Sequence, residues 1–85
     1  MYSKKVVVKK ETGLHARPGA EVVSMAMGFQ SDITLYKGEK KINAKEVLEI
    51  LSADINFNDE ILIEANGADE EVAVETLEKY IGSTE

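Results

Sequence analysis

Four short stretches of the chain carry the alternating or β-branched pattern that is typical of strands. They are residues 5–9, residues 31–37, a run around residues 41–43, and residues 60–65. In the second stretch Ile33 and Leu35 alternate with polar neighbours, which predicts a strand with one buried face. The Lys-Gly-Glu-Lys run at 37–40 is turn-forming, so the second and third strands are predicted to form a hairpin.

Three further segments place apolar residues at helical spacing. A first helix is predicted over residues 16–27, ending at Gly28, with a stripe that predicts core packing: Ala16, Ala20, Val23 and Met27. A short second helix is predicted over residues 45–52, where four apolar residues exceed one buried stripe, so that some should be exposed: Val47, Leu48, Ile50 and Leu51. A closing amphipathic helix is predicted over residues 69–81, with these residues inward: Ala73, Leu77 and Ile81.

The predicted order of elements is β-α-β-β-α-β-α. This order predicts an α+β fold in which the helices lie on one face of a mostly antiparallel sheet. Eighty-five residues suffice for one small core, so residues 1–85 are expected to form a single domain with its chemistry at the surface. The order of the strands within the sheet does not follow from these patterns.

The composition narrows the class of function. The chain has no cysteine and one histidine, which excludes disulfides and thiol nucleophiles and leaves a metal site unsupported. The apolar run at residues 6–8 is too short for a signal peptide or a membrane span, so we expect a cytoplasmic protein. A net charge of −6 argues against nucleic-acid binding, and no Gly-rich loop followed by Lys-Ser/Thr supports nucleotide hydrolysis. A Ser-His-Asp triad stays open, although a chain this small offers little cleft for one.

The charge is unevenly distributed along the chain. Residues 1–45 carry nine cations against four acids, whereas residues 46–85 carry one cation against twelve acids. The acidic half is interpreted as solvated faces, but the basic half contains the histidine. A positive field around that histidine would favour an anionic substrate or a partner with an acidic docking surface.

The only histidine and the only proline lie in the segment Gly-Leu-His-Ala-Arg-Pro-Gly-Ala at residues 13–20. If Gly13 turns the chain and the helix begins at Ala16, then His15 takes the N-cap position, where unpaired N–H groups attract anions. Pro18 in the first turn gives up an N–H that would have no intrahelical acceptor. The positive helix end disfavours imidazolium, which leaves a lone pair on His15 available as a nucleophile.

Arg17 adds a fixed fork of donors that can hold a phosphoryl group better than a lysine can. Nucleophile, cation and backbone donors together suit accepting a phosphoryl group on nitrogen and passing it on. Hydrolysis has weaker support, because Glu11 and Glu21 are candidates for a water-activating base only by sequence distance. The plain alternative is a structural domain whose histidine is an incidental surface residue.

The run Thr-Gly-Leu-His-Ala-Arg-Pro at residues 12–18 resembles the active-site signature of the histidine-containing phosphocarrier protein (HPr) family. This family belongs to the bacterial phosphoenolpyruvate-dependent sugar phosphotransferase system. The similarity extends along nearly the whole chain, with further matches at Phe29, 31–33, Lys40, Lys41, Asn43, Lys45, 65–67 and 69–70. It implies an open-faced β-sandwich of four strands with three helices on one face.

The resemblance also implies a function without a cofactor. His15 would accept a phosphoryl group through its Nδ1 from phosphorylated Enzyme I and pass it to the IIA domain of a sugar permease. The chain would thus be a carrier and protein substrate, expected as a monomer, rather than an enzyme. Arg17 would steady the phosphoryl group, and the backbone amides of Ala16 and Arg17 would bind it. The partner-docking surface would contain Ala20, Val47, Leu48 and Leu51.

The sequence departs from the family pattern near that surface. Glu46 stands where many members carry a regulatory serine; it has no hydroxyl to phosphorylate, and we interpret it as an acid at a helix start, worth about 0.5 kcal/mol. Glu49 and Asp54 replace residues that are commonly glycine, which adds acids around the docking patch. A second hypothesis therefore stays open: an HPr-like regulatory paralogue whose phosphorylation state at His15 controls a target protein.

Overall fold

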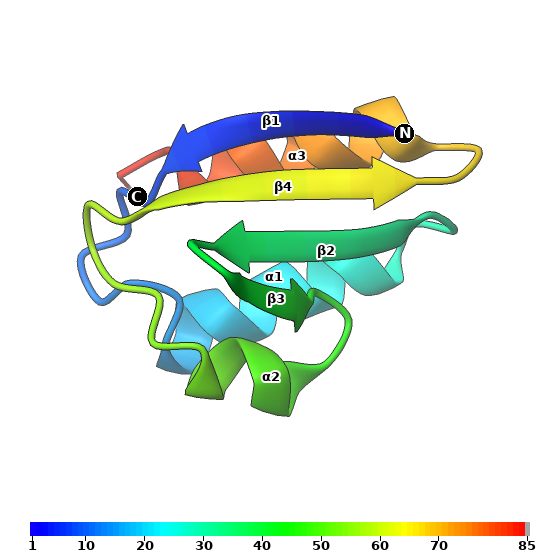
Figure 1. Cartoon of the computed structure of the whole chain (residues 1–85). Coiled ribbons are helices and arrows are strands. Elements are labelled where there is room, and N and C mark those ends of the chain that lie inside the picture. The colour runs from blue at the N-terminus through cyan, green and yellow to red at the C-terminus, as the bar shows by residue number, and fades with distance from the viewer. Residues whose placement is uncertain (85) are drawn as a thin grey trace.

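The computed structural model describes residues 1–84 and contains seven elements. In chain order they are β1 (Tyr2–Val7), α1 (Ala16–Met27), β2 (Asp32–Lys37), β3 (Lys40–Asn43), α2 (Val47–Ser52), β4 (Glu60–Asn66) and α3 (Glu70–Ile81). The strands form one antiparallel sheet in the order β1-β4-β2-β3, and the helices lie on one side of it (Figure 1). The predicted α+β fold and the order of its elements are confirmed.

The core lies between the sheet and the helices. Alternate residues of β2 and β4 point inward, and register pairs such as Leu35 with Ile63 place two branched apolar side chains side by side. From the helical side α3 adds four buried residues, Ala73, Val74, Leu77 and Ile81. The inward stripe predicted for the closing helix is therefore confirmed, with Val74 in addition.

The buried face of α1 differs from the prediction. The buried residues are Gly19, Val22 and Ala26, whereas Ala16, Ala20 and Met27 are exposed and Val23 is half-buried. The prediction was wrong because two adjacent stripes on this helix both have helical spacing, and periodicity cannot decide between them. The close approach of α2 to Gly19 determines which stripe is buried, since a Cβ on Gly19 would lie 2.9 Å from Leu51 Cδ2 and 2.6 Å from the Leu14 carbonyl oxygen.

Two predicted boundaries also shift, each because of a tertiary or side-chain contact. β1 begins at Tyr2 and ends at Val7, since its register with β4 runs from the Tyr2–Ala65 pair to the Val7–Glu60 pair. α2 begins at Val47 rather than at residue 45, because the Asn43 side chain accepts the Lys45 N–H at 2.9 Å and holds a turn there.

Opposite charges from the two halves of the chain meet at β1 and α3. Lys4 Nζ lies 3.6 Å from a Glu78 carboxylate oxygen, and the Tyr2 hydroxyl donates to Glu75 at 2.9 Å. The hydrogen bond to Glu75 raises the pKa of the Tyr2 hydroxyl, because that bond stabilises its protonated form. Part of the basic half therefore serves the fold.

Candidate functional site

The turn that leads into α1 fits closely against the loop between α2 and β4. Gly13 has φ +70°, and its N–H donates to the Lys10 carbonyl at 2.8 Å. A Cβ on Gly13 would lie 2.2 Å from the Ile55 carbonyl oxygen, and that same oxygen accepts the Leu14 N–H at 2.9 Å. Gly13 is thus required both for its left-handed backbone and for the space it leaves, and the turn brings His15 beside residues 54–56.

His15 is the N-cap of α1, as predicted, but its side chain caps nothing. Its backbone is extended (φ −110°, ψ 162°), and the imidazole makes no hydrogen bond to the first turn. The ring is half-buried, and its Nε2 lies 2.9 Å from Asn56 Oδ1. The imidazole is therefore held from one side by the 53–59 loop, while its Nδ1 makes no hydrogen bond within residues 1–84.

The first turn of α1 leaves its backbone donors free. Ala16 has φ +51°, a left-handed conformation that costs a residue with a Cβ about 1–2 kcal/mol. In the part of the chain that the structure describes, the N–H groups of Ala16 and Arg17 have no acceptor, and the turn contains no acid. An unpaired, uncapped helix start beside a histidine is an anion-binding arrangement.

Arg17 is the most available cation at this helix start. Its side chain is 89% exposed, and its Nε lies 3.7 Å from a carboxylate oxygen of Glu21 one turn later, a long and weak pair. The other nearby cations have structural partners: Lys9 Nζ donates to Asn58 Oδ1 at 3.3 Å, and the buried Lys10 Nζ lies 4.0 Å from the centroid of the Tyr80 ring. Fewer cations are therefore available to an anion near His15 than the charge of residues 1–45 predicted.

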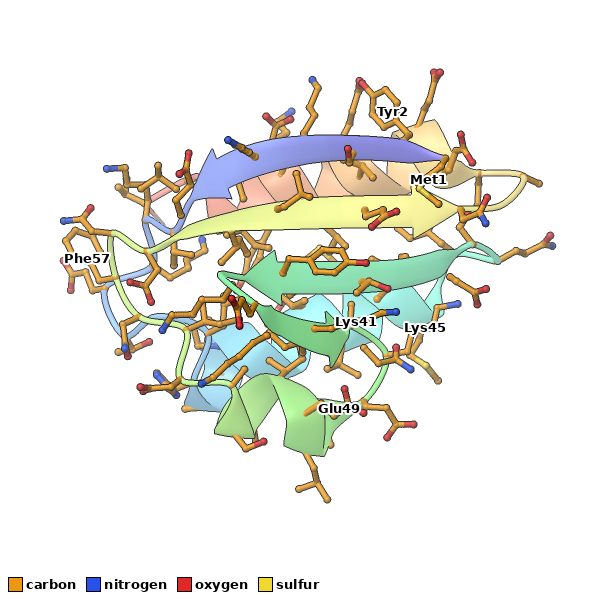
Figure 2. The ribbon with its side chains drawn as sticks, viewed as in Figure 1. Met1, Tyr2, Lys41, Lys45, Glu49 and Phe57 are labelled. Carbon is orange, nitrogen blue, oxygen red and sulfur yellow. The ribbon has the colours of Figure 1, made fainter. Side chains whose placement is uncertain are left out.

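Several tertiary bonds hold the loop at residues 53–59 against the site. The Asp59 carboxylate accepts the Asn56 N–H at 2.7 Å and lies 2.9 Å from Lys37 Nζ, and both contacts lower the pKa of Asp59. Lys37 also donates to the Asp54 carbonyl. Phe57, which follows Asn56 in this loop, is exposed at the end of the molecule opposite Met1 (Figure 2). None of these contacts that hold the loop involves His15.

The residues predicted to dock partners are all exposed and come from two neighbouring helices. Ala20 lies on α1 next to Gly19, which α2 contacts through Leu51. On α2, Ile50 is buried and anchors the helix, whereas the other three apolar residues are 41%, 76% and 38% exposed: Val47, Leu48 and Leu51. The prediction that some of these four residues are exposed is confirmed. In Figure 1, α1 lies behind β2 and β3, and α2 lies next to it at the bottom of the view.

The three acids that depart from the family pattern have different environments. Glu46 is the exposed N-cap of α2, and its side chain makes no cap hydrogen bond. The Glu49 carboxylate turns toward the end of β3, where it accepts the Asn43 N–H at 2.8 Å (Figure 2). Asp54 has φ +61°, and its carboxylate accepts from the side-chain amide of Asn56, the residue that contacts His15.

Sequence reasoning did not find Asn56. The residue is 41 positions away from His15 and belongs to no motif, so only the fold reveals their contact. Among residues 1–84, no group of three His, Cys, Asp or Glu side chains could hold a metal ion. No helix in the same range is long and apolar enough to cross a membrane.

Comparisons with known proteins identify relatives of this chain. The family model described as "PTS HPr component phosphorylation site" matches residues 2–83. The chain is 41% identical over 81 residues to the HPr-like protein Crh of Bacillus subtilis, an alignment that covers 95% of each chain.

Solved structures show the same fold. A phosphocarrier protein HPr from Bacillus anthracis superposes with a TM-score of 0.92 at 39% identity, over 94% of this chain and 95% of that one. A structure described as an HPr dimer from Thermoanaerobacter tengcongensis gives a TM-score of 0.71 at 39% identity, over 91% and 88%. With a signature that matches from residue 2 to residue 83, this chain belongs to the HPr family of the phosphotransferase system.

Proposed function

We propose that residues 1–85 form a single-domain, cytoplasmic phosphoryl carrier. His15 takes a phosphoryl group from phosphorylated Enzyme I and gives it to the IIA domain of a sugar permease. One observation carries the proposal: His15 stands at the N-cap position of a helix whose Ala16 and Arg17 amides have no acceptor within the described chain and whose first turn contains no acid. Membership of the HPr family supports the same role.

The transfer uses the lone pair of Nδ1, the atom that the family resemblance assigns. The Nδ1–P bond forms as the bond between phosphorus and the donor atom of Enzyme I breaks, and that donor atom keeps the electron pair. The amides of Ala16 and Arg17 and the Arg17 guanidinium then face the added negative charge. The second transfer reverses these roles, with Nδ1 as the leaving atom. The chain acts as a protein substrate in both steps.

The proposed docking surface is the exposed apolar group defined above on α1 and α2. Ala20 and Leu51 lie close to the first turn of α1, so a partner that covers them reaches His15 at the same time. Exposed leucines on a short helix suit a hydrophobic contact with a partner. A monomer in solution is part of the proposal, and sedimentation measurements test it.

Incubation with Enzyme I and phosphoenolpyruvate tests the carrier function. We expect one acid-labile phosphoryl group per chain by mass spectrometry, and none on His15→Ala. Arg17→Ala should still accept the group, but about tenfold more slowly, since it loses a charged donor. Phosphorylation of His15→Ala at the wild-type level would contradict the assignment.

A regulatory paralogue is the second candidate, favoured by the 41% identity to a protein named HPr-like and by the acids Glu46, Glu49 and Asp54. In this role phosphorylation of His15 would control a target protein instead of sugar uptake. Complementation of uptake in an HPr-deficient strain separates the two functions. Normal uptake would count against a purely regulatory role, and phosphorylation without uptake would favour it.

A further inference from the structure

The imidazole of His15 has one hydrogen-bonding neighbour within residues 1–84, the side chain of Asn56. The two atoms in contact are Nε2 of the ring and Oδ1 of the amide, 2.9 Å apart. A carbonyl oxygen can only accept, so this contact is a hydrogen bond only when Nε2 carries the proton. The orientation of the Asn56 amide therefore decides which tautomer of His15 the site favours.

Asp54 fixes that orientation. The amide nitrogen of Asn56 donates to the Asp54 carbonyl oxygen at 3.2 Å and to the Asp54 carboxylate at 3.3 Å. A flipped amide would direct its oxygen at these two acceptors and lose both hydrogen bonds. Its Oδ1 must therefore face the histidine.

The backbone beneath Asn56 is held as well. Its N–H donates to the Asp59 carboxylate, and Lys37 bonds to both Asp59 and the Asp54 carbonyl. Asp54 and Asn58, two residues before and after Asn56, both have positive φ values. Asn56 Oδ1 is therefore held in place in the isolated chain. A side chain that positions a reactive group such as His15 has to be fixed in this way.

We propose that Asn56 is a positioning residue that holds neutral His15 as the Nε2–H tautomer. The lone pair is then confined to Nδ1, the ring atom that makes no hydrogen bond within the described chain. The consequence for transfer rests on the proposed function: a single nitrogen is nucleophilic, and Nε2 keeps its proton and its bond to Asn56 throughout. The tautomer itself is a property of the isolated chain.

Nitrogen-15 NMR of the uniformly labelled chain measures this directly, because a single histidine gives one set of ring signals. Above the pH at which the ring titrates, we expect two-bond correlations to show a protonated Nε2 and an unprotonated Nδ1. Asn56→Ala should lower the ratio of Nε2–H to Nδ1–H tautomers roughly fivefold, because it removes one neutral hydrogen bond.

Asn58→Gly is the matched control. It removes an asparagine side chain two residues along the same loop, which contacts Lys9 instead of His15, and glycine tolerates its φ of +73°. This control should keep the wild-type ratio. A wild type that is mainly the Nδ1–H tautomer, or an unchanged ratio in Asn56→Ala, would overturn the proposal. Enzyme I is absent from the measurement, so failure of phosphoryl transfer and failure of this inference are separate results.

Discussion

The two twelve-residue helices of this protein begin in opposite ways. α3 begins after Asp69, whose carboxylate accepts the N–H groups of Gln30 and Ser31 and the Ser31 hydroxyl, and its first turn contains two further acids. α1 begins after His15, and its first turn contains no acid. Neither N-cap side chain bonds to the first turn of its own helix, so the two helix starts differ in charge. Both are preceded by a glycine that fits closely against another loop, Gly67 against Ser31 and Gly13 against Ile55.

This difference distinguishes a helix start that stabilises the fold, at α3, from the candidate anion-binding site, at α1. At α3 the protein supplies its own negative charge, and the N-terminal ammonium of Met1 adds a salt bridge to Glu70 at 2.9 Å. At α1 the fold keeps the same close glycine but leaves out the acids, so the positive end of the helix stays available to an incoming anion. The identity of the first residues, more than the shape of the turn, marks the site.

Loss of the close fit at α1 should have the largest effect. Gly13→Ala adds a Cβ where the Ile55 carbonyl lies 2.2 Å away and forces alanine to φ +70°. We expect the free energy of unfolding to fall by about 3 kcal/mol, measured by urea denaturation. Gly38→Ala is the control, since Gly38 has φ +59° with nothing within 4 Å, and it should cost about 1 kcal/mol. Equal losses would mean that backbone conformation alone accounts for Gly13.

Making α1 resemble α3 should remove most of the carrier activity. Ala16→Asp places a carboxylate in the open first turn, and aspartate accepts the left-handed backbone found there. We expect phosphorylation by Enzyme I to slow about tenfold relative to Ala16→Asn, which has nearly the same shape without the charge. Equal rates for the two variants would show that the charge of the first turn does not matter for transfer.

Removing the negative charge of Asp69 at the start of α3 tests whether that charge stabilises the fold. The Ser31 hydroxyl, followed by the Gln30 N–H, lowers the pKa of Asp69 below its ordinary value of 3.8. The carboxylate therefore stabilises the fold fully above that value, and the stabilisation is lost as the pH falls through the lower folded-state pKa. Asp69→Asn should be less stable than wild type at pH 7, and the difference should shrink below about pH 4. A difference that does not depend on pH would point to shape rather than charge.

The smallest effect on stability is expected for the ion pair between Arg17 and Glu21 on α1. Glu21→Gln removes the long 3.7 Å pair with Arg17, whose side chain is almost fully exposed. We expect the free energy of unfolding to change by less than about 0.5 kcal/mol, measured by thermal and urea denaturation. A loss well above that value would mean that Arg17 has a structural role.

The sequence predicted this contrast only in part. The bounds of α1, the N-cap position of His15 and the acids of α3 are local properties, and each was predicted from spacing and capping preferences. The buried face of α1 was predicted wrongly, because Gly19 is buried through contact with α2, a tertiary fact. The first residues of β1 were missed for the same kind of reason, since their pairing partners lie in β4.

The candidate site shows the same division between local and distant information. His15, Ala16 and Arg17 are consecutive, so a single motif indicated all three. Asn56 comes from a loop that packs on Gly13, and no spacing rule connects positions that far apart. Its amide is aimed by Asp54, a residue that sequence comparison with the family marked only as an unusual acid.

The central place of β4 has a consequence for the order of events during synthesis. β1 pairs only with β4, and β2 pairs with β3 and β4, so before residues 60–66 emerge the only pairing that can form is the β2–β3 hairpin. Most long-range pairing therefore waits for the last third of the chain. The loop at residues 53–59 hydrogen-bonds to Val8, which directly follows β1, and β1 has β4 as its only partner strand, so the acceptor for His15 is placed at the same late stage. A nascent chain consequently carries the histidine long before it carries a finished site.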